Sequence, residues 1–239
     1  MTRLYALFFL SGASALMYEV LWTRRLSLTL GHTVLAVSSV VSIFMLGLGV
    51  GSFFGGRWAD RRSSSLLLRD YARLEFLVAL WGAFSLLLLT LFEHAYIRLA
   101  ASGQHGLPLY LFGFLGAFVV LFAPTTAMGA TLPLLSRLVI LQPREFGAKL
   151  ARLYGFNTLG GCLGSIAAGF LLLPLLGLNL SVGVAVLVNL WVAWMAGRVE
   201  VSETAPVSSL TENPSEPVAH GQLVVACLGA AAAMTCQIG

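Results

Sequence analysis

Charge is scarce in this sequence and cysteine is rare. Only 10% of its 239 residues are charged, against 58% that are hydrophobic. Soluble domains usually carry about 25% charged residues, so the composition excludes a water-soluble globule. The three cysteines, Cys162, Cys227 and Cys236, lie in apolar runs without metal-ligand spacing, and they indicate neither a disulfide framework nor a zinc site. We expect no metal and no cofactor in this chain.

Long apolar runs take the place of charge. A helix that crosses a bilayer needs about 20 apolar residues, and seven such runs predict an all-α, polytopic membrane helix bundle. The fourth run is too long for one straight span and contains Pro124 and Pro133, so we expect a kinked helix there. The predicted spans cover residues 4–22, 33–56, 74–96, 107–139, 153–176, 178–197 and 222–239.

The basic residues predict the orientation, because short loops rich in Lys and Arg stay in the cytoplasm. With the N-terminus inside, eleven of the 14 basic residues face the cytoplasm and three face outward. The inner set is Arg3, Arg57, Arg61, Arg62, Arg69, Arg73, Arg137, Arg144, Lys149, Arg152 and Arg198, and the outer set is Arg24, Arg25 and Arg98. We therefore expect a multi-pass protein of an inner (plasma) membrane, with its N-terminus in the cytoplasm and with the lipid bilayer and not nucleic acid as its partner. The alternative for residues 1–15 is a cleaved signal peptide.

The composition changes abruptly between residues 199 and 220, which contain Glu, Pro, Ser and Thr but no Lys or Arg. Such a segment is typical of a solvated linker. We predict a six-helix bundle over 1–198, an acidic cytoplasmic linker over 199–220 and a seventh helix over 221–239. The last helix weakly echoes the first, since Glu19 aligns with Gln237. This order is the pattern of a transporter built from two parallel six-helix halves.

Glycines recur at four-residue spacing in two of the predicted spans. Gly47, Gly51 and Gly55 share one helix face, and Gly160 with Gly164 and Ala168 share another, while Gly161, Ser165 and Gly169 form a parallel ladder one residue out of phase. Small residues at this spacing let two membrane helices approach closely. We predict that Gly47, Gly51, Gly55, Gly160, Gly164 and Gly169 pack against neighbouring helices.

The exit of the second span reads Gly56-x-x-x-Asp60-Arg61. It resembles the loop signature between helices two and three of the major facilitator superfamily, in which the acidic residue and its basic neighbours latch the two halves together. That resemblance implies a latch formed by Gly56, Asp60, Arg61 and Arg137. The sequence departs from the signature after Arg61, where Arg62-Ser63 replaces x-Gly and its basic pair. The alternative is an ordinary basic loop with one Asp.

Glu19 is the acid that falls most clearly within a predicted span. Acids inside a bilayer are costly and by default mark a functional site. We predict that Glu19 binds a cation or a proton, with Tyr18 and Asn157 as neutral neighbours. The alternative is a structural ion pair with Arg24 or Arg25, which follow within two turns.

Four ordered blocks carry a more specific resemblance, to the membrane portion of the fused major-facilitator/spermidine synthase proteins of bacteria. They are Ser11-Gly-Ala-Ser-Ala-Leu-Met-Tyr18-Glu19, Met45-Leu-Gly-Leu-Gly-Val-Gly51 with Gly55-Gly-Arg-Trp-Ala-Asp60-Arg, Pro124-Thr-Thr-Ala-Met-Gly129-Ala-Thr-Leu-Pro133, and Leu153-Tyr154-Gly-Phe-Asn157. That family pairs transporter-like helices with a C-terminal aminopropyltransferase-like domain. That soluble domain is absent from these residues, and they contain no set of catalytic residues. Whether the chain forms part of an enzyme is left open by the sequence.

The leading functional prediction is binding or translocation of a small cationic solute such as a polyamine, by two helical bundles that rock around a midplane site. Two alternatives remain from the sequence. The helices can anchor an aminopropyltransferase domain without transporting anything, or they can serve as a scaffold subunit whose glycine-rich faces bind other membrane proteins.

Overall fold

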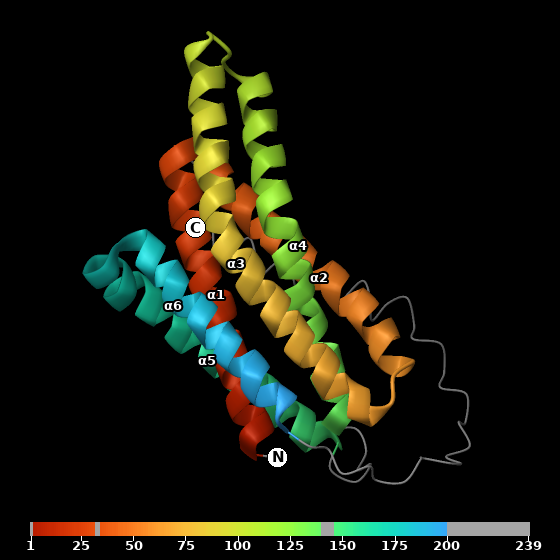
Figure 1. Cartoon of the computed structure of the whole chain (residues 1–239). Coiled ribbons are helices and arrows are strands. Elements are labelled where there is room, and N and C mark those ends of the chain that lie inside the picture. The colour runs from red at the N-terminus through yellow and green to blue at the C-terminus, as the bar shows by residue number, and fades with distance from the viewer. Residues whose placement is uncertain (1, 32–33, 140–145, 200–239) are drawn as a thin grey trace. The chain divides into compact units, whose positions relative to one another are not determined.

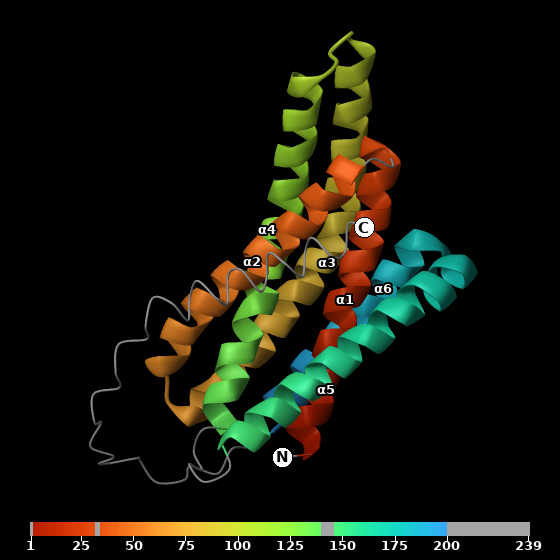
Figure 2. The same cartoon turned by 180° about the vertical axis from the view of Figure 1, so that it is seen from behind.

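The computed structural model describes residues 2–31, 34–139 and 146–199, and this part of the chain is helical with short connections (Figures 1 and 2). The predicted all-α class is confirmed. The elements are α1 (Thr2–Leu30), α2 (Val34–Asp60), α3 (Ser64–Ala101), α4 (Leu107–Val139), α5 (Phe146–Ile166), the π-helical segment η2 (Ala167–Leu172) and α6 (Leu173–Gly197). The predicted seventh helix and the predicted linker from residue 200 onward lie outside the described residues.

Five helical stretches within the described residues are long and apolar enough to cross a bilayer, judged by length and composition. Six spans were expected over the same part of the chain. The counts differ because residues 147–197 form one continuous helical stretch instead of two separate helices. Its helical geometry is interrupted at Gly177, where φ is 73° and ψ is 177°, a conformation that only glycine adopts without steric cost. The interruption falls between the two predicted spans, and α5 and α6 each pack against α1.

The third helix begins ten residues earlier than predicted. Residues 57–73 are rich in charge and were expected to form a loop, but only 61–63 separate α2 from α3. Arg69, Asp70 and Arg73 therefore lie within the first turns of α3, and Glu75 lies well inside it. With a rise of 1.5 Å per residue, Glu75 is about 18 Å along the helix axis from Ser63. The fourth helix runs through both Pro124 and Pro133 as a single element.

Two helix pairs form the closest crossings in the bundle. On α2, a Cβ added at Gly47, Gly51 or Gly55 would overlap Thr125, the Thr126 carbonyl or Ala130 of α4, respectively. On α5, a Cβ at Gly160 or Gly164 would overlap the backbone of Phe9 or Ala13 of α1. These five glycines therefore lie where two backbones meet, and a larger residue at any of them would force the helices apart.

Gly169 differs from the prediction. No atom of a neighbouring element lies within 4 Å of the position that its Cβ would occupy. The ladder from Gly161 through Ser165 to Gly169 assumes an uninterrupted α-helix, but η2 begins at Ala167. A π-helical segment uses i→i+5 hydrogen bonds and so changes the face on which the next small residue lies. Gly56 likewise has open space around it.

The outward faces of the helices are apolar. Many large hydrophobic side chains are exposed, with members on α2, α3, α4, η2 and α6; they include Phe53, Phe54, Phe76, Leu80, Leu91, Leu115, Val119, Phe170, Leu175, Leu180 and Leu187. Soluble monomers rarely expose contiguous apolar patches of more than a few hundred Å². Polar side chains gather instead in the interior and at the ends of the bundle.

The glycine crossings generate a stability prediction with an internal control. Gly164→Ala should lower the free energy of unfolding by about 1–3 kcal/mol, because its Cβ would overlap the Ala13 backbone. Gly169→Ala should leave stability unchanged or slightly higher, because its surroundings are open and alanine favours helix. Thermal unfolding of the purified variants in detergent measures both. Equal losses in the two variants would contradict the assignment of the α1–α5 contact.

Candidate functional site

A cavity of about 320 Å³ lies between the α1–α5 pair and the α2–α4 pair. Residues of α1, α2, α4 and α5 form its walls, and each of these helices supplies at least one side chain with a hydroxyl or an amide group. The polar lining residues are Ser11, Ser52, Thr131, Tyr154, Asn157 and Thr158. The apolar lining residues include Phe8, Leu16, Phe44, Leu48, Met128 and Leu132. A mostly apolar hollow with a few polar groups is the usual form of a small-molecule site.

Asn157 reaches this cavity because α5 lies against α1. Its carbonyl oxygen and its side-chain oxygen both lie beside Gly12, where any Cβ would overlap them. Ser11, the next residue of α1, lines the same cavity. The predicted site residue Asn157 is thus placed on the cavity wall next to α1, while Tyr18 and Glu19 do not line this cavity.

Ser11 connects the cavity with a buried acid that the sequence argument missed. Its hydroxyl donates a hydrogen bond of 2.5 Å to Oε1 of Glu75 on α3. The other carboxylate oxygen, Oε2, accepts a hydrogen bond of 2.5 Å from Nδ2 of Asn189 on α6. Tyr71, one turn before Glu75, also interacts with this carboxylate and lies within 3.5 Å of the Leu7 carbonyl. Glu75 is only 1% exposed.

A periodic signal for this buried acid is present in the sequence. The buried positions of α3 include Leu67, Tyr71, Leu74, Val78 and Ser85, and they follow one helix face through the charged segment before Glu75. This buried face is not apparent when the charged residues Arg69, Asp70 and Arg73 are assigned to a loop. Because the charges belong to the first turns of α3, Glu75 falls in the interior and not at a helix end.

Glu19 lines a second pocket of about 440 Å³, together with Leu16, Thr23, Arg24, Ser27 and residues of α2 and α6. Tyr18 faces elsewhere: it is fully buried, lies against Gly82 of α3 and stacks on Trp22 with ring centroids 4.8 Å apart. The predicted trio of Glu19, Tyr18 and Asn157 is therefore not gathered around one pocket. Leu16 lines both pockets and links them along α1.

The two arginines after Glu19 have separate surroundings. Arg25 forms an ion pair of 2.7 Å with Glu93 of α3, and its Nη2 also donates to Thr90. Arg24 shares a pocket with Glu19, but within the described ranges no Lys, Arg or His nitrogen lies within 4 Å of the Glu19 carboxylate. The structural ion pair considered as the alternative for Glu19 is thus not present among these residues.

Ion pairing at the opposite end of the bundle centres on Asp70 and not on Asp60. Asp70 is 1% exposed, with Arg62 Nε 3.1 Å from Oδ2 and Arg73 Nη1 donating to Oδ1 at 3.0 Å. Asp60, Arg61 and Arg137 are exposed, and no ion pair joins Asp60 to Arg137 in the described part of the chain. The latch between two halves stays a prediction.

None of the described residues forms a metal site of three or more His, Cys, Asp or Glu ligands. Cys162 is a free, exposed thiol, and the other two cysteines lie outside the described residues. The arrangement offers hydrogen bonding and charge: an apolar cavity with a few polar groups, a pocket with the Glu19 carboxylate, and the buried Glu75 carboxylate behind the cavity wall.

The chain is similar to proteins named polyamine aminopropyltransferase. It is 26% identical over 202 residues to one from Leptospira interrogans, a match over 81% of this chain and 36% of the relative. The identity is 31% over 173 residues for polyamine aminopropyltransferase 2 of Streptomyces coelicolor, a match over 71% of this chain and 29% of the relative. The identity is 28% over 177 residues for polyamine aminopropyltransferase 2 of Ralstonia nicotianae, a match over 71% of this chain and 30% of the relative.

The chain thus spans about a third of the length of these curated relatives. No family model matches it, and no solved structure gives a significant match. The spermidine-synthase side of the expected resemblance is supported by these names. The major-facilitator side stays a prediction.

The two ion pairs of Asp70 predict that this residue contributes more to the stability of the fold than the exposed Asp60 does. Asp70→Asn should lower the free energy of unfolding by about 1–3 kcal/mol, because it removes the charge from a buried acceptor that contacts two arginines. Asp60→Asn, at an exposed position, should change it by no more than about 0.5 kcal/mol. Denaturant or thermal unfolding in detergent measures both. A larger loss for Asp60→Asn would show that the exposed aspartate carries the interaction.

Proposed function

We propose that this chain is the membrane-embedded helical module of a polyamine-related protein and that it binds a small cationic amine such as spermidine. The observation that carries the proposal is the cavity between α1, α2, α4 and α5, a mostly apolar hollow with six polar lining residues, which shares Leu16 with the pocket of Glu19. The similarity to polyamine aminopropyltransferases supports the class of solute.

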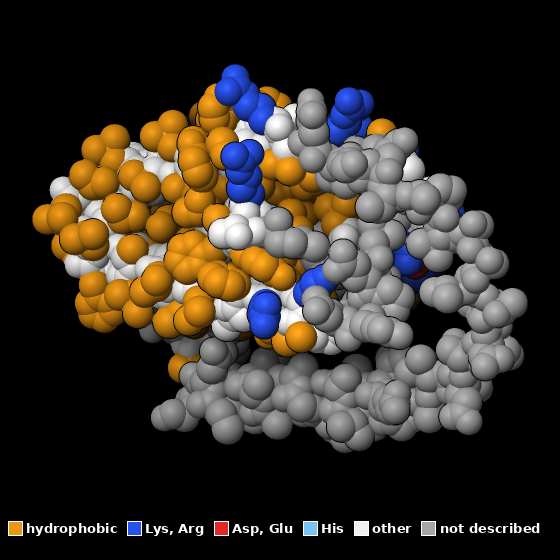
Figure 3. Space-filling view, turned by 90° about the horizontal axis from the view of Figure 1, so that it is seen from below, with side chains coloured by type: hydrophobic (Ala, Val, Ile, Leu, Met, Phe, Trp, Pro, Cys, Tyr) orange, Lys and Arg blue, Asp and Glu red, His pale blue; other side chains and the backbone are white. Residues whose placement is uncertain are grey.

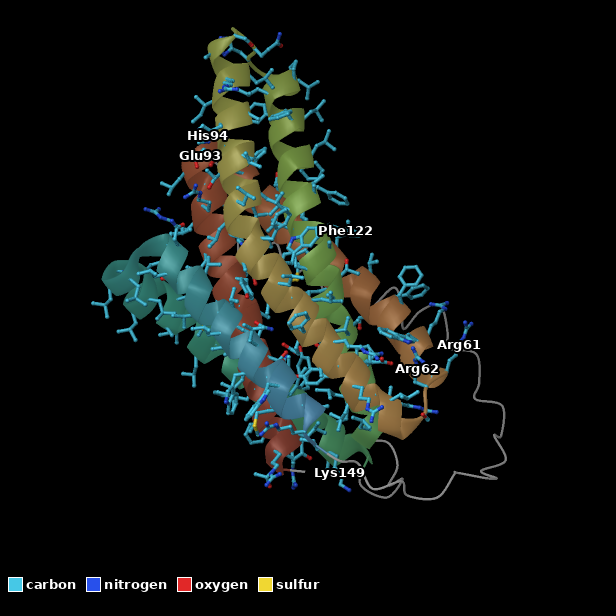
Figure 4. All side chains as sticks on the ribbon, in the orientation of Figure 1. Arg61, Arg62, Glu93, His94, Phe122 and Lys149 are labelled. Atoms are coloured by element: carbon cyan, nitrogen blue, oxygen red, sulfur yellow. The ribbon has the colours of Figure 1, made fainter. Side chains whose placement is uncertain are left out.

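A bilayer location accounts for the distribution of side chains. The five apolar helical stretches and the exposed apolar side chains of the outward faces suit contact with lipid. Arg61, Arg62 and Lys149 lie at one end of the bundle and Glu93 and His94 lie toward the other (Figure 4). Figure 3 views the first end and shows several Lys and Arg side chains next to a large apolar flank. The excess of basic residues favours this end as the cytoplasmic one.

One face of α1 lines both pockets. Gly12, Leu16, Glu19, Thr23 and Ser27 recur at three- or four-residue spacing and line one pocket or the other. From Ser11 to Glu19 the helix rises by about 12 Å. A long, flexible amine can place one ammonium group at the Glu19 carboxylate, lay its methylene groups along Leu16 and direct a second ammonium group toward the oxygens of Ser11 and Asn157. Carboxylate and hydroxyl oxygens accept the hydrogen bonds that an ammonium group donates.

The proposed mechanism is transport by two helical halves that rock about a midplane site, with the described bundle as one of the halves and its cavity as part of the solute path. A second candidate is favoured by a different observation. The relatives carry the name of an enzyme, and this chain corresponds to about a third of their length. The helices can therefore hold an aminopropyltransferase domain at the membrane, with no solute of their own.

The orientation is tested by single cysteines at the two ends of α3. In a background without native cysteines, His105→Cys should react in intact cells with an impermeant maleimide, because residue 105 is exposed at the predicted outer end. Ser63→Cys, exposed at the predicted inner end, should react only after the membrane is permeabilised. The reverse pattern would invert the proposed topology.

Solute binding is tested by calorimetry with spermidine on the purified chain in detergent. Glu19→Gln should weaken binding tenfold or more, because a hydrogen bond to a charged group contributes about 1.5–3 kcal/mol. Glu93→Gln is the matched control: it also removes one carboxylate charge from a helix, but one that pairs with Arg25 away from the pockets, so binding should not change.

Absence of any spermidine binding by the unmodified chain would favour the anchoring role. Equal weakening by both substitutions would show that overall charge, and not the Glu19 pocket, determines the affinity.

A further inference from the structure

Glu75 has no part in the binding site just proposed, and its environment differs from that of the paired acids nearby. Asp70 contacts two arginines and Glu93 contacts one. The side chains that hydrogen-bond Glu75 are Ser11, Asn189 and Tyr71, none of which carries a positive charge. In the described part of the chain no Lys, Arg or His nitrogen lies within 4 Å of its carboxylate. An ionised carboxylate buried without a cation is costly.

The neutral partners of Glu75 can serve either protonation state. A serine or tyrosine hydroxyl and an asparagine amide can each donate to a carboxylate or accept from a carboxylic acid. An arginine can only donate, and therefore fixes its partner in the ionised form. The titratable groups that interact with Glu75 are Tyr71 on its own helix and Tyr18 on α1; α6 contributes Asn189. The site is thus built to hold a carboxyl group that changes its charge.

A second observation points to an exchangeable proton at this place. Asn189 is 2% exposed and bonds Glu75 through Nδ2, yet its carbonyl oxygen Oδ1 is buried without a hydrogen-bond partner. The buried Tyr18 hydroxyl also has none. Buried polar atoms without partners cost about 1–3 kcal/mol each. In the ionised state Asn189 Oδ1 has no donor, and a proton on Glu75 supplies one when the Asn189 amide turns its oxygen toward Oε2.

Ser11 is the structural link between this cluster and the cavity, because it lines the cavity and bonds Glu75 at once. A hydroxyl has one hydrogen to donate and two lone pairs that accept. When an ammonium group in the cavity donates to the Ser11 oxygen, the Ser11 hydrogen is directed toward Glu75, which favours the ionised carboxylate. The positive charge of the amine acts in the same direction but more weakly, because Glu75 does not line the cavity and Ser11 lies between them.

We propose that Glu75 is a proton-binding site coupled through Ser11 to cation binding in the cavity. When the cavity is empty, Glu75 holds a proton. When an amine enters, the Oε–H bond of Glu75 breaks as its proton passes to the Ser11 oxygen, and the original Ser11 O–H bond breaks as that hydrogen passes to water in the cavity and then to the solvent. The carboxylate then accepts from the new Ser11 hydroxyl and from Asn189. Binding of one amine therefore releases one proton. This inference rests on the proposed function for the identity of the cation, but Glu75 itself can be observed without any solute.

Infrared difference spectroscopy on the purified chain tests the proposal. A protonated carboxyl group gives a C=O stretching band that a carboxylate lacks. The unmodified chain should show this band with no solute, and Glu75→Gln should lose it, because Gln has the shape of the protonated acid but cannot ionise. Spermidine should abolish the band in the unmodified chain. Glu93→Gln, the matched control, should keep both the band and its response.

Ser11→Ala separates coupling from proton binding. It should retain the band, because Glu75 is unchanged, but spermidine at a concentration that saturates this variant should no longer abolish it. Calorimetry in buffers of different ionisation enthalpy should then count one proton released per spermidine for the unmodified chain and none for Glu75→Gln or Ser11→Ala.

The failures are distinguishable. If the unmodified chain binds no spermidine, the proposed solute is wrong and the coupling is overturned with it. If spermidine binds but the Glu75 band is missing at every pH, or is insensitive to saturating spermidine, the proton-site inference is overturned while the proposed function stands. Loss of the band in Glu93→Gln would show that it does not arise from Glu75.

Discussion

Direct contact between helix backbones is the constraint on which the rest of this structure depends. Gly160 and Gly164 let α5 meet α1, and Gly51 and Gly55 let α2 meet α4. In each pair the backbones approach closely because no large side chain separates them at the crossing. The cavity is the space that remains between the two pairs, and its polar groups are those that the crossings leave uncovered. A bulkier residue at a crossing would therefore alter the cavity as well as the stability.

The acidic side chains of α3 differ in the groups that surround them. Asp70 and Glu93 are held by arginines near opposite ends of α3, where the guanidinium groups keep partial contact with solvent. Glu75 lies between them along the same helix and is surrounded by neutral groups. Electrostatic interactions are stronger in such an interior than in water. The carboxylates are thus paired where arginine is present and held by neutral groups where it is absent.

The candidate site could be predicted only in part from the sequence. Asn157 lines the cavity and Glu19 lines a pocket, but Tyr18 turns to α3 and packs behind Trp22. Adjacent residues on a helix point about 100° apart, so Tyr18 and Glu19 cannot be assigned to one pocket without knowing how α1 is rotated. The motif around Asp60 predicts a latch at that residue, and no local pattern marks Asp70, which the fold buries beside Arg62 and Arg73.

Composition and spacing determined that this chain folds into long apolar helices, that basic residues gather at one end, and that glycines mark two close crossings. These properties are local, because a run of apolar residues or a four-residue repeat acts through neighbours in the same helix. Only the tertiary structure decided that Glu75 is buried and that its partners are Ser11 and Asn189, which are 64 and 114 residues away. The rotation and tilt of three helices bring these groups together. Such angles result from packing over the whole bundle, and no local pattern in the chain encodes them.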